Sequence, residues 1–323
     1  MNELVLFALK AGVVVLAFVA VLIAITLSFR RRGDDRPHLE VRDLNERFEW
    51  LADSLRDELL SKREWKALLK ERKKRPKQPD QPRVYVLDFD GDVLASAVTH
   101  LREEVTALLP LLRAQDEVVL RLESPGGGVA HYGLAAAQLT RLKERSVKLT
   151  VCVDRVAASG GYMMACVADT IVAAPFSIVG SIGVVAQVPN FHRVLKKYDV
   201  DYEELTAGEF KRTVSTFGEI TEKGRAKFVE QLEETHALFK DFVKSRRPSL
   251  DVNAIANGEY WLGRRARELG LVDTLSTSDD YLLGRAEAAQ LYGVRFRPKR
   301  QWRDRLGDGA LALLARLDSL TLR

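Results

Sequence analysis

Ser159 stands at a place in the sequence where a serine hydroxyl could act as a nucleophile. It lies in the run Ala-Ala-Ser-Gly-Gly-Tyr at 157–162, between a predicted strand at 148–153 and a predicted helix at 161–168. The next amide, that of Gly160, could face a developing negative charge, and the start of the helix would strengthen this interaction. The alternative is that Ser159 only caps the helix, as serine often does. Both interpretations stay open on this motif alone.

A glycine-rich turn, Ser-Pro-Gly-Gly-Gly at 124–128, follows a predicted strand at 118–122. Glycine permits positive φ and lets backbone amides approach a ligand without a Cβ in the way. The turn lacks the lysine and Ser/Thr of a P-loop and the spacing of a dinucleotide site. An oxyanion hole is therefore the better use for it, although glycine turns between a strand and a helix are often only structural.

A serine hydroxyl needs a base to take its proton, and the histidines offer none. Each is predicted to lie in a helix or a linker, at a position typical of packing or of the surface. They are His38, His100, His131, His192 and His236. Ser-Lys pairs are a known variant of the serine triad, but a lysine acts as a base only if burial lowers its pKa from about 10.4 towards neutrality. A catalytic lysine would have to come from a partly buried place.

The elements that position these turns alternate between short β-rich runs and helical runs. Strands are predicted at 84–89, 118–122, 148–153 and 170–173, with helices at 100–112, 130–143 and 161–168, and a long charged helix at 222–246. Strands separated by helices of this length indicate a mainly parallel sheet with helices on both faces. In such sheets, functional residues collect where the strands end. The predicted fold class is therefore α/β.

The chain before this region carries two further patterns. Ala11 to Phe29 is an uncharged apolar run of 19 residues, long enough to cross a bilayer core of about 30 Å as a helix. It favours a retained anchor over a cleaved signal peptide, because no A-x-A site follows it. The arginines behind it favour a cytoplasmic catalytic domain. They are Arg30, Arg31, Arg32 and Arg36.

A short heptad-like seam follows the predicted anchor, and its residues are Val41, Leu44, Phe48, Leu51 and Leu55. It predicts a helix that packs between subunits or on its own domain. Arg72 to Pro82 contains three prolines and is typical of a linker. The predicted organisation is a transmembrane anchor at 1–32, a helical extension and linker at 33–82, an α/β domain at 83–293 and a basic, amphipathic tail at 294–323. The apolar stretch Leu306 to Leu320 in that tail is a second candidate assembly surface.

Composition excludes several classes of protein. The chain has 50 basic and 45 acidic residues, and 46% of its residues are hydrophobic, which argues against disorder of the whole chain. The basic excess lies in flanking runs without a nucleic-acid-binding motif, so no nucleic-acid partner is expected. Cys152 and Cys166 lie in apolar runs and are expected to be buried thiols. No cofactor and no metal site is expected.

Four motifs occur in an order that resembles the signal peptide peptidase A family. They are the runs at 124–128 and 157–162, Gly-Ser-Ile-Gly-Val at 180–184 and Gly-Glu-Phe-Lys at 208–211. The stretches 258–261 and 266–273 are also similar to the end of that family's catalytic region. The resemblance covers about 84–275, and the amino-terminal extension is similar to that of the SohB branch. It implies a fold like that of crotonases and Clp proteases.

The resemblance also implies a role for each matching residue. Ser159 corresponds to the nucleophile and Lys211 to the general base, while Ser181 corresponds to a serine that holds the lysine ammonium. Gly127 and Gly160 correspond to the donors of the oxyanion hole. Lys211 has apolar neighbours in sequence, Phe210, Val214 and Phe217, that could exclude water, but charged residues are also close and an ordinary surface lysine is the alternative.

The function implied is that of a serine endopeptidase of the bacterial inner membrane. Its substrates would be membrane-associated or misfolded proteins and signal peptide remnants. Family members form rings in which the serine and the lysine of one site can belong to different chains, and related catalytic domains lie outside the cytoplasm, in conflict with the arginine cluster. Two alternatives stay open, a crotonase-like enzyme acting on thioesters and an inactive scaffold that binds membrane proteins.

Overall fold

The computed structural model describes residues 11, 12, 15, 37–74 and 80–299. The chain divides into two compact units, residues 39–296 and residues 1–38 with 297–323. Almost all of the second unit lies outside the described residues, and so do nearly all of the predicted anchor and the whole of the 306–320 stretch. Among the helices that are described, none combines the length and the apolar character needed to cross a membrane.

A seven-stranded sheet forms the centre of the 39–296 unit. Its strands run in the order β1-β10-β2-β3-β4-β6-β9, and each neighbouring pair from β10 to β9 is parallel. The strands are β1 (His38–Asp43), β2 (Arg83–Asp90), β3 (Glu117–Glu123), β4 (Lys148–Val153), β6 (Thr170–Ala173), β9 (Thr274–Leu275) and β10 (Gln290–Arg297). The prediction of an α/β fold with a mainly parallel sheet is confirmed.

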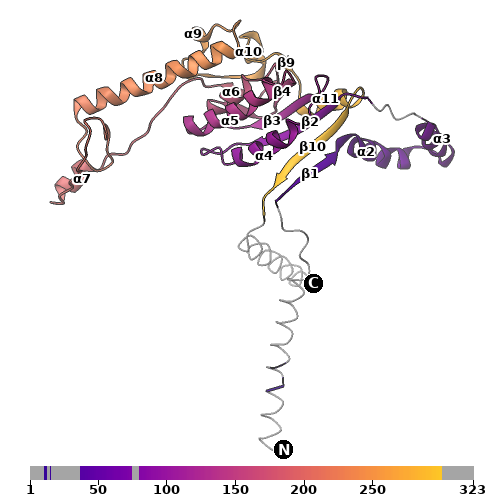
Figure 1. Cartoon of the computed structure of the whole chain (residues 1–323), viewed down its shortest axis with the longest axis horizontal. Coiled ribbons are helices and arrows are strands. Elements are labelled where there is room, and N and C mark those ends of the chain that lie inside the picture. Colours follow the sequence, from indigo (N-terminus) through magenta and orange to yellow (C-terminus); the bar gives the residue numbers. More distant parts are fainter. Residues whose placement is uncertain (1–10, 13–14, 16–36, 75–79, 300–323) are drawn as a thin grey trace, which may run out of the picture. The chain divides into compact units, whose positions relative to one another are not determined.

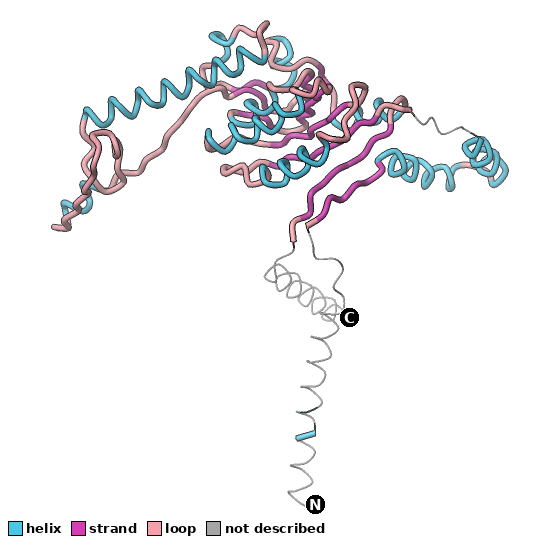
Figure 2. Tube along the Cα trace, viewed as in Figure 1, coloured by secondary structure: helices cyan, strands magenta, loops and turns pink. Residues whose placement is uncertain are grey.

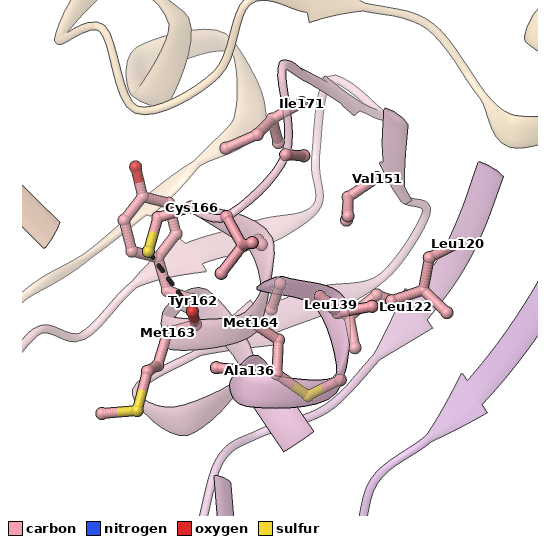
Figure 3. Packing of buried hydrophobic residues seen from close by; sticks show 14 of the residues in the cluster. Leu120, Leu122, Ala136, Leu139, Val151, Tyr162, Met163, Met164, Cys166 and Ile171 are labelled. Atoms are coloured by element: carbon pink, nitrogen blue, oxygen red, sulfur yellow. Dashed lines mark hydrogen bonds between the residues drawn. The ribbon is translucent and has the colours of Figure 1, made fainter. Parts of the chain in front are cut away.

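The apolar runs of the central strands bury side chains on both faces of the sheet, as parallel sheets require. On one face, Leu87 of β2 and Leu120 of β3 pack under α4 (Val98–Leu108), α5 (Val129–Lys143) and α6 (Gly160–Ala165). Figure 3 shows Tyr162 and Met164 of α6 in this layer with residues of α5 and of the strands. On the other face, Val86 packs with α11 (Ser278–Ala286) and with the start of α2 (Leu44–Leu59).

The segment at 33–82 differs from the expectation at its beginning. Val41 lies in strand β1 beside β10 rather than in a helix, because the Asp43 side chain accepts the Glu46 amide and starts α2 at Leu44. Leu44 and Phe48 pack against the sheet, whereas Leu51 and Leu55 of the predicted seam are exposed. Helix α3 (Lys62–Lys74) follows α2.

A second, three-stranded sheet has no counterpart in the sequence prediction. Its order is β5 (Val156–Ala158), β7 (Ile178–Gly180) and β8 (Tyr260–Leu262). Strands β5 and β7 are parallel and pair Ala158 with Gly180, while β7 and β8 are antiparallel. The residues that follow the paired ends of β5 and β7 are Ser159 and Ser181, so this small sheet aligns two of the predicted site residues.

Beyond β7 the chain leaves the sheets, reaches α7 (His192–Lys197) and returns along α8 (Glu222–Arg246), as Figures 1 and 2 show. Residues 183–221 with the first half of α8 are called the arm below. The only buried residues of α8 are Phe239 and Val243, both in its second half. Short helices α9 (Val252–Ile255) and α10 (Gly263–Glu268) then lead to β9.

The two thiols and the histidines mostly take their predicted places. Cys152 and Cys166 are buried and unpaired, and burial raises the pKa of each thiol to about 12. Four of the histidines lie in helices as predicted, whereas His38 begins strand β1 rather than lying in a linker.

Candidate active site

Ser159 occupies a strained turn between β5 and α6. Its φ is 52° and its ψ is −117°, a conformation that non-glycine residues rarely adopt and that often marks a functional site. Its amide donates to the Gly180 carbonyl at 2.8 Å, and its own carbonyl accepts the Met163 amide at 3.0 Å. The side chain is half-buried and makes no capping hydrogen bond to α6. The capping interpretation is therefore wrong, and the hydroxyl is available.

The glycine-rich turn lies directly against Ser159. The Ser124 amide donates to Val156 and the Ala158 amide donates to Ser124, at 2.8 and 3.0 Å, so backbone hydrogen bonds join the end of β3 to β5. A Cβ on Gly126 would lie 2.7 Å from the Ser159 Cβ and 2.8 Å from the Gly160 nitrogen. The structure thus brings together the two turns that lie 35 residues apart in the sequence.

Two backbone donors at this place have no acceptor within the part of the chain that the structure describes. The Gly126 amide donates to the Ser124 Oγ and the Gly128 amide to the Val93 carbonyl, but the Gly127 amide between them donates to nothing. The Gly160 amide is likewise unpaired, as expected of the first amide of a helix. Unused amides beside a free hydroxyl are what an oxyanion would need.

Ser181 lies next to Ser159 because it follows β7 in the same register in which Ser159 follows β5. It also has positive φ, 51°, and its amide donates to the Glu259 carbonyl at 2.7 Å. Its half-buried side chain makes no hydrogen bond to any described residue, so its hydroxyl is available to accept a hydrogen bond from another group.

Lys211 is not part of this cluster. It lies on the arm, its amide donates to the Gly208 carbonyl at 3.1 Å, and its side chain is exposed without a hydrogen bond or ion pair to any residue in the described ranges. Its neighbours Phe210 and Phe217 are 39% and 43% exposed. The expectation that they keep water from Lys211 is wrong for the single chain, because the arm carries these aromatic rings away from the core.

The contacts of α8 indicate how far Lys211 is from Ser159. The loop that carries Lys211 rests on the first turns of the helix, where a Cβ on Gly224 would lie 2.4 Å from the Thr213 carbonyl. Further along, the Nε2 of His236 is 3.2 Å from the carbonyl of Ile182, the residue after Ser181. Gly224 and His236 are twelve residues apart in α8, which is about 18 Å along a helix. That separation exceeds the reach of a lysine side chain.

Two buried hydroxyls behind the glycine turn were not singled out from the sequence. Ser124 and Tyr132 are both 0% exposed, and their oxygens are 2.5 Å apart. Ser124 was considered only as part of the glycine motif, and Tyr132 has the ordinary pattern of an apolar helix position. No sequence signal distinguishes them, since their relation depends on packing between β3 and α5.

No three His, Cys, Asp or Glu side chains gather into a possible metal site anywhere in the described ranges.

Comparison with known proteins identifies the family. Residues 141–292 match Peptidase family S49, and residues 1–139 match the Peptidase family S49 N-terminal region. The chain belongs to peptidase family S49. It is 50% identical over 323 residues to the probable protease SohB of Haemophilus influenzae, covering 94% of this chain and 91% of that protein.

A second relative by sequence agrees with this membership. A probable protease SohB of Buchnera aphidicola is 53% identical over 217 residues, covering 67% of this chain and 65% of that protein. Among solved structures, a membrane-bound stomatin-specific protease in complex with a substrate peptide is similar to this chain with a TM-score of 0.41 and 12% identity, over 64% of this chain and 80% of that one. The resemblance to the SohB branch is confirmed, and the chain is a serine-type peptidase that acts on polypeptides.

Proposed function

We propose that this peptidase hydrolyses peptide bonds with Ser159 as nucleophile and Lys211 as general base. The observation that carries the proposal is the uncapped Ser159 hydroxyl beside the unpaired amides of Gly127 and Gly160. The arrangement of a glycine turn after a parallel strand, facing the first turn of a helix, also fits a fold like that of crotonases and Clp proteases. Retention of a lysine at 211 favours a peptidase over a thioester enzyme.

In the proposed reaction, the neutral amine of Lys211 takes the Ser159 proton while Oγ attacks the carbonyl carbon of the substrate. The carbonyl oxygen becomes negatively charged between the Gly127 and Gly160 amides. Lys211 then gives its proton to the leaving amine as the C–N bond breaks. Water attacks the acyl ester, the same amine takes its proton, and the proton returns to Ser159 as the acid leaves. Ser181 would accept a hydrogen bond from the ammonium.

A neighbouring copy of the chain would supply Lys211 to each site. Two observations support this part of the proposal. The loop that carries Lys211 contacts α8 at Gly224, whereas the residue after Ser181 contacts it twelve residues further on, at His236. The Lys211 side chain is also exposed. A lysine in water keeps its proton at neutral pH, so it becomes a base only when packing removes the water around it. The arm presents exposed aromatic residues that a second subunit could cover. They are Phe191, Tyr198, Tyr202, Phe210 and Phe217.

A serine-directed fluorophosphonate tests whether Ser159 is activated. We expect the full chain to be modified at Ser159 in the assembled protein, with one adduct identified by peptide mass spectrometry, because only a serine with a nearby base reacts readily. Ser181 and Ser124 serve as internal controls and should stay unmodified. Absence of an adduct on an assembled sample that is otherwise folded would favour the inactive-scaffold alternative and contradict the proposal.

We also propose that residues 11–29 hold the protein in the bacterial inner membrane, where it degrades membrane-associated or misfolded proteins and signal peptide remnants. The apolar run and the arginines behind it support this placement. The full chain should stay with membranes through an alkaline carbonate wash, and a variant lacking residues 1–32 should be released. Release of the full chain would contradict the anchor. Protease treatment of intact spheroplasts then reports the side on which the catalytic domain lies.

A further inference from the structure

A buried chain of hydrogen bonds runs behind the glycine turn. The Tyr132 hydroxyl donates to the Asp92 carbonyl at 2.7 Å, which uses its single hydrogen. The Ser124 hydroxyl, 2.5 Å away, must therefore donate to the Tyr132 oxygen, and its own oxygen accepts the Gly126 amide at 3.1 Å. The donor and the acceptor of each bond are therefore determined: the Gly126 amide donates to Ser124, Ser124 to Tyr132, and Tyr132 to the Asp92 carbonyl.

The ring of Tyr132 touches the other half of the site. A Cβ on Gly160 would lie 2.3 Å from the Tyr132 Cγ and 2.7 Å from its Cβ, so the start of α6 packs closely against the base of this side chain. Tyr132 thus packs against the Gly160 backbone, and its hydroxyl is bonded to the Ser124 hydroxyl, which accepts the Gly126 amide of the 124–128 turn. Those are the two segments that carry the unpaired amides.

Tyr132 is closely packed on several sides. A Cβ on Gly91 would lie 2.6 Å from both the Ser124 Oγ and the Tyr132 hydroxyl oxygen, and the ring of Phe89 packs edge-on at 6.5 Å between centroids. Burial also raises the pKa of Tyr132, so that it remains a neutral donor at physiological pH. A buried, neutral hydroxyl at this place can hold the Ser124 hydroxyl, and through it the Gly126 amide, in one arrangement.

We propose that Tyr132 and Ser124 are positioning residues that set the spacing between the Gly127 and Gly160 amides. Neither residue touches the substrate. The inference rests on the proposed function, since it assumes that these two amides bind the oxyanion. Because the bound substrate carries a neutral carbonyl and the negative charge develops only as the tetrahedral intermediate forms, a change in the spacing of the donors should lower kcat and leave the binding of substrate almost unchanged.

The decisive variant is Tyr132→Phe, which keeps the ring against Gly160 and removes only the hydroxyl. The Ser124 hydroxyl then loses its acceptor and the turn loses its fixed position. A displacement approaching 1 Å costs on the order of 100-fold in rate, so we expect kcat to fall by roughly 10- to 100-fold with KM changed by less than about threefold. Ser124→Ala should produce a loss of similar size, because it removes the acceptor of the Gly126 amide.

The matched control is Tyr162→Phe. Tyr162 is also 0% exposed, and its hydroxyl donates to the Leu271 carbonyl at 3.1 Å, away from the glycine turn. Tyr162→Phe loses one hydrogen bond to a backbone carbonyl, whereas Tyr132→Phe loses its bond to Asp92 and also the bond from Ser124. Both variants should therefore lower Tm, and Tyr132→Phe should lower it more. Only Tyr132→Phe should weaken the binding of a peptide aldehyde, whose adduct places an oxyanion in the hole, and neither should change the affinity for a product peptide.

Three outcomes separate the possibilities. Weaker aldehyde binding in Tyr132→Phe and Ser124→Ala, in proportion to the loss of kcat, supports the positioning role. An unchanged kcat in Tyr132→Phe, with Ser159 still labelled by the fluorophosphonate, overturns the positioning role and leaves the proposed function intact. If instead Ser159→Ala keeps full activity, the proposed function fails and this inference fails with it. Should Tyr132→Phe not fold, Ser124→Ala decides the question alone.

Discussion

Replacing Ser159 by alanine is expected to lower the turnover of an unfolded protein substrate by at least about 10,000-fold, as loss of a catalytic serine does in other peptidases. The hydroxyl is the proposed attacking group, because it makes no capping hydrogen bond and lies beside the unpaired amides of Gly127 and Gly160. Turnover is measured as the release of new amino termini from a denatured protein, with the full chain assembled in detergent or membranes.

Ser146→Ala is the control for this variant. Ser146 also has a positive φ, 56°, and lies in the turn between α5 and β4, so this variant places alanine at another position of positive φ, in a turn that carries none of the proposed site residues. It should keep the activity of the unmodified protein. Undiminished turnover by Ser159→Ala, with Ser146→Ala behaving normally, would exclude Ser159 as the nucleophile.

Replacing Lys211 by alanine is expected to cause a loss of similar size, and mixing should reveal which chain provides the lysine. If each site takes Ser159 from one subunit and Lys211 from the next, a random equal mixture of Ser159→Ala and Lys211→Ala chains keeps about a quarter of its sites intact. If both residues came from one chain, every site in the mixture would lack one of them. The measurement is turnover before and after the two variants exchange subunits.

Lys196→Ala controls for damage to the arm, because Lys196 is an exposed lysine in α7 and should tolerate the change. Formation of mixed assemblies is checked with a different tag on each variant. A mixture that demonstrably contains both chains in one assembly and still shows no turnover would place the dyad within a single chain and contradict the shared site.

Much of the fold could be predicted because its central strands are rich in apolar residues and are separated by helices of ordinary length. The limits of β4, β6 and α8 were predicted to the residue. The three-residue strands β5, β7 and β8 could not be predicted, since a pattern of three residues carries no period and their pairing joins segments that are distant in sequence. Strand β1 was missed for a related reason, because Val41 and Leu44 also fit a helical spacing and only the Asp43 cap separates them.

The site was predictable to a different degree for each residue. The glycine turn and Ser159 both follow strands, and parallel strands place their ends together, so their proximity followed from the fold class. The exposure of Lys211 could not be predicted in this way. Apolar neighbours in sequence indicate burial only where the chain is packed, and residues 183–221 extend away from the sheets (Figure 1). The partnership of Ser124 with Tyr132 depends on contacts that no local pattern encodes.

The arm holds Lys211 away from Ser159 of the same chain. If Ser159 and Lys211 act together as proposed, a newly made chain would be inert until it joined other copies. At low abundance the rate of cleavage would then rise more steeply than the amount of protein, which would protect the cell from cleavage by unassembled chains.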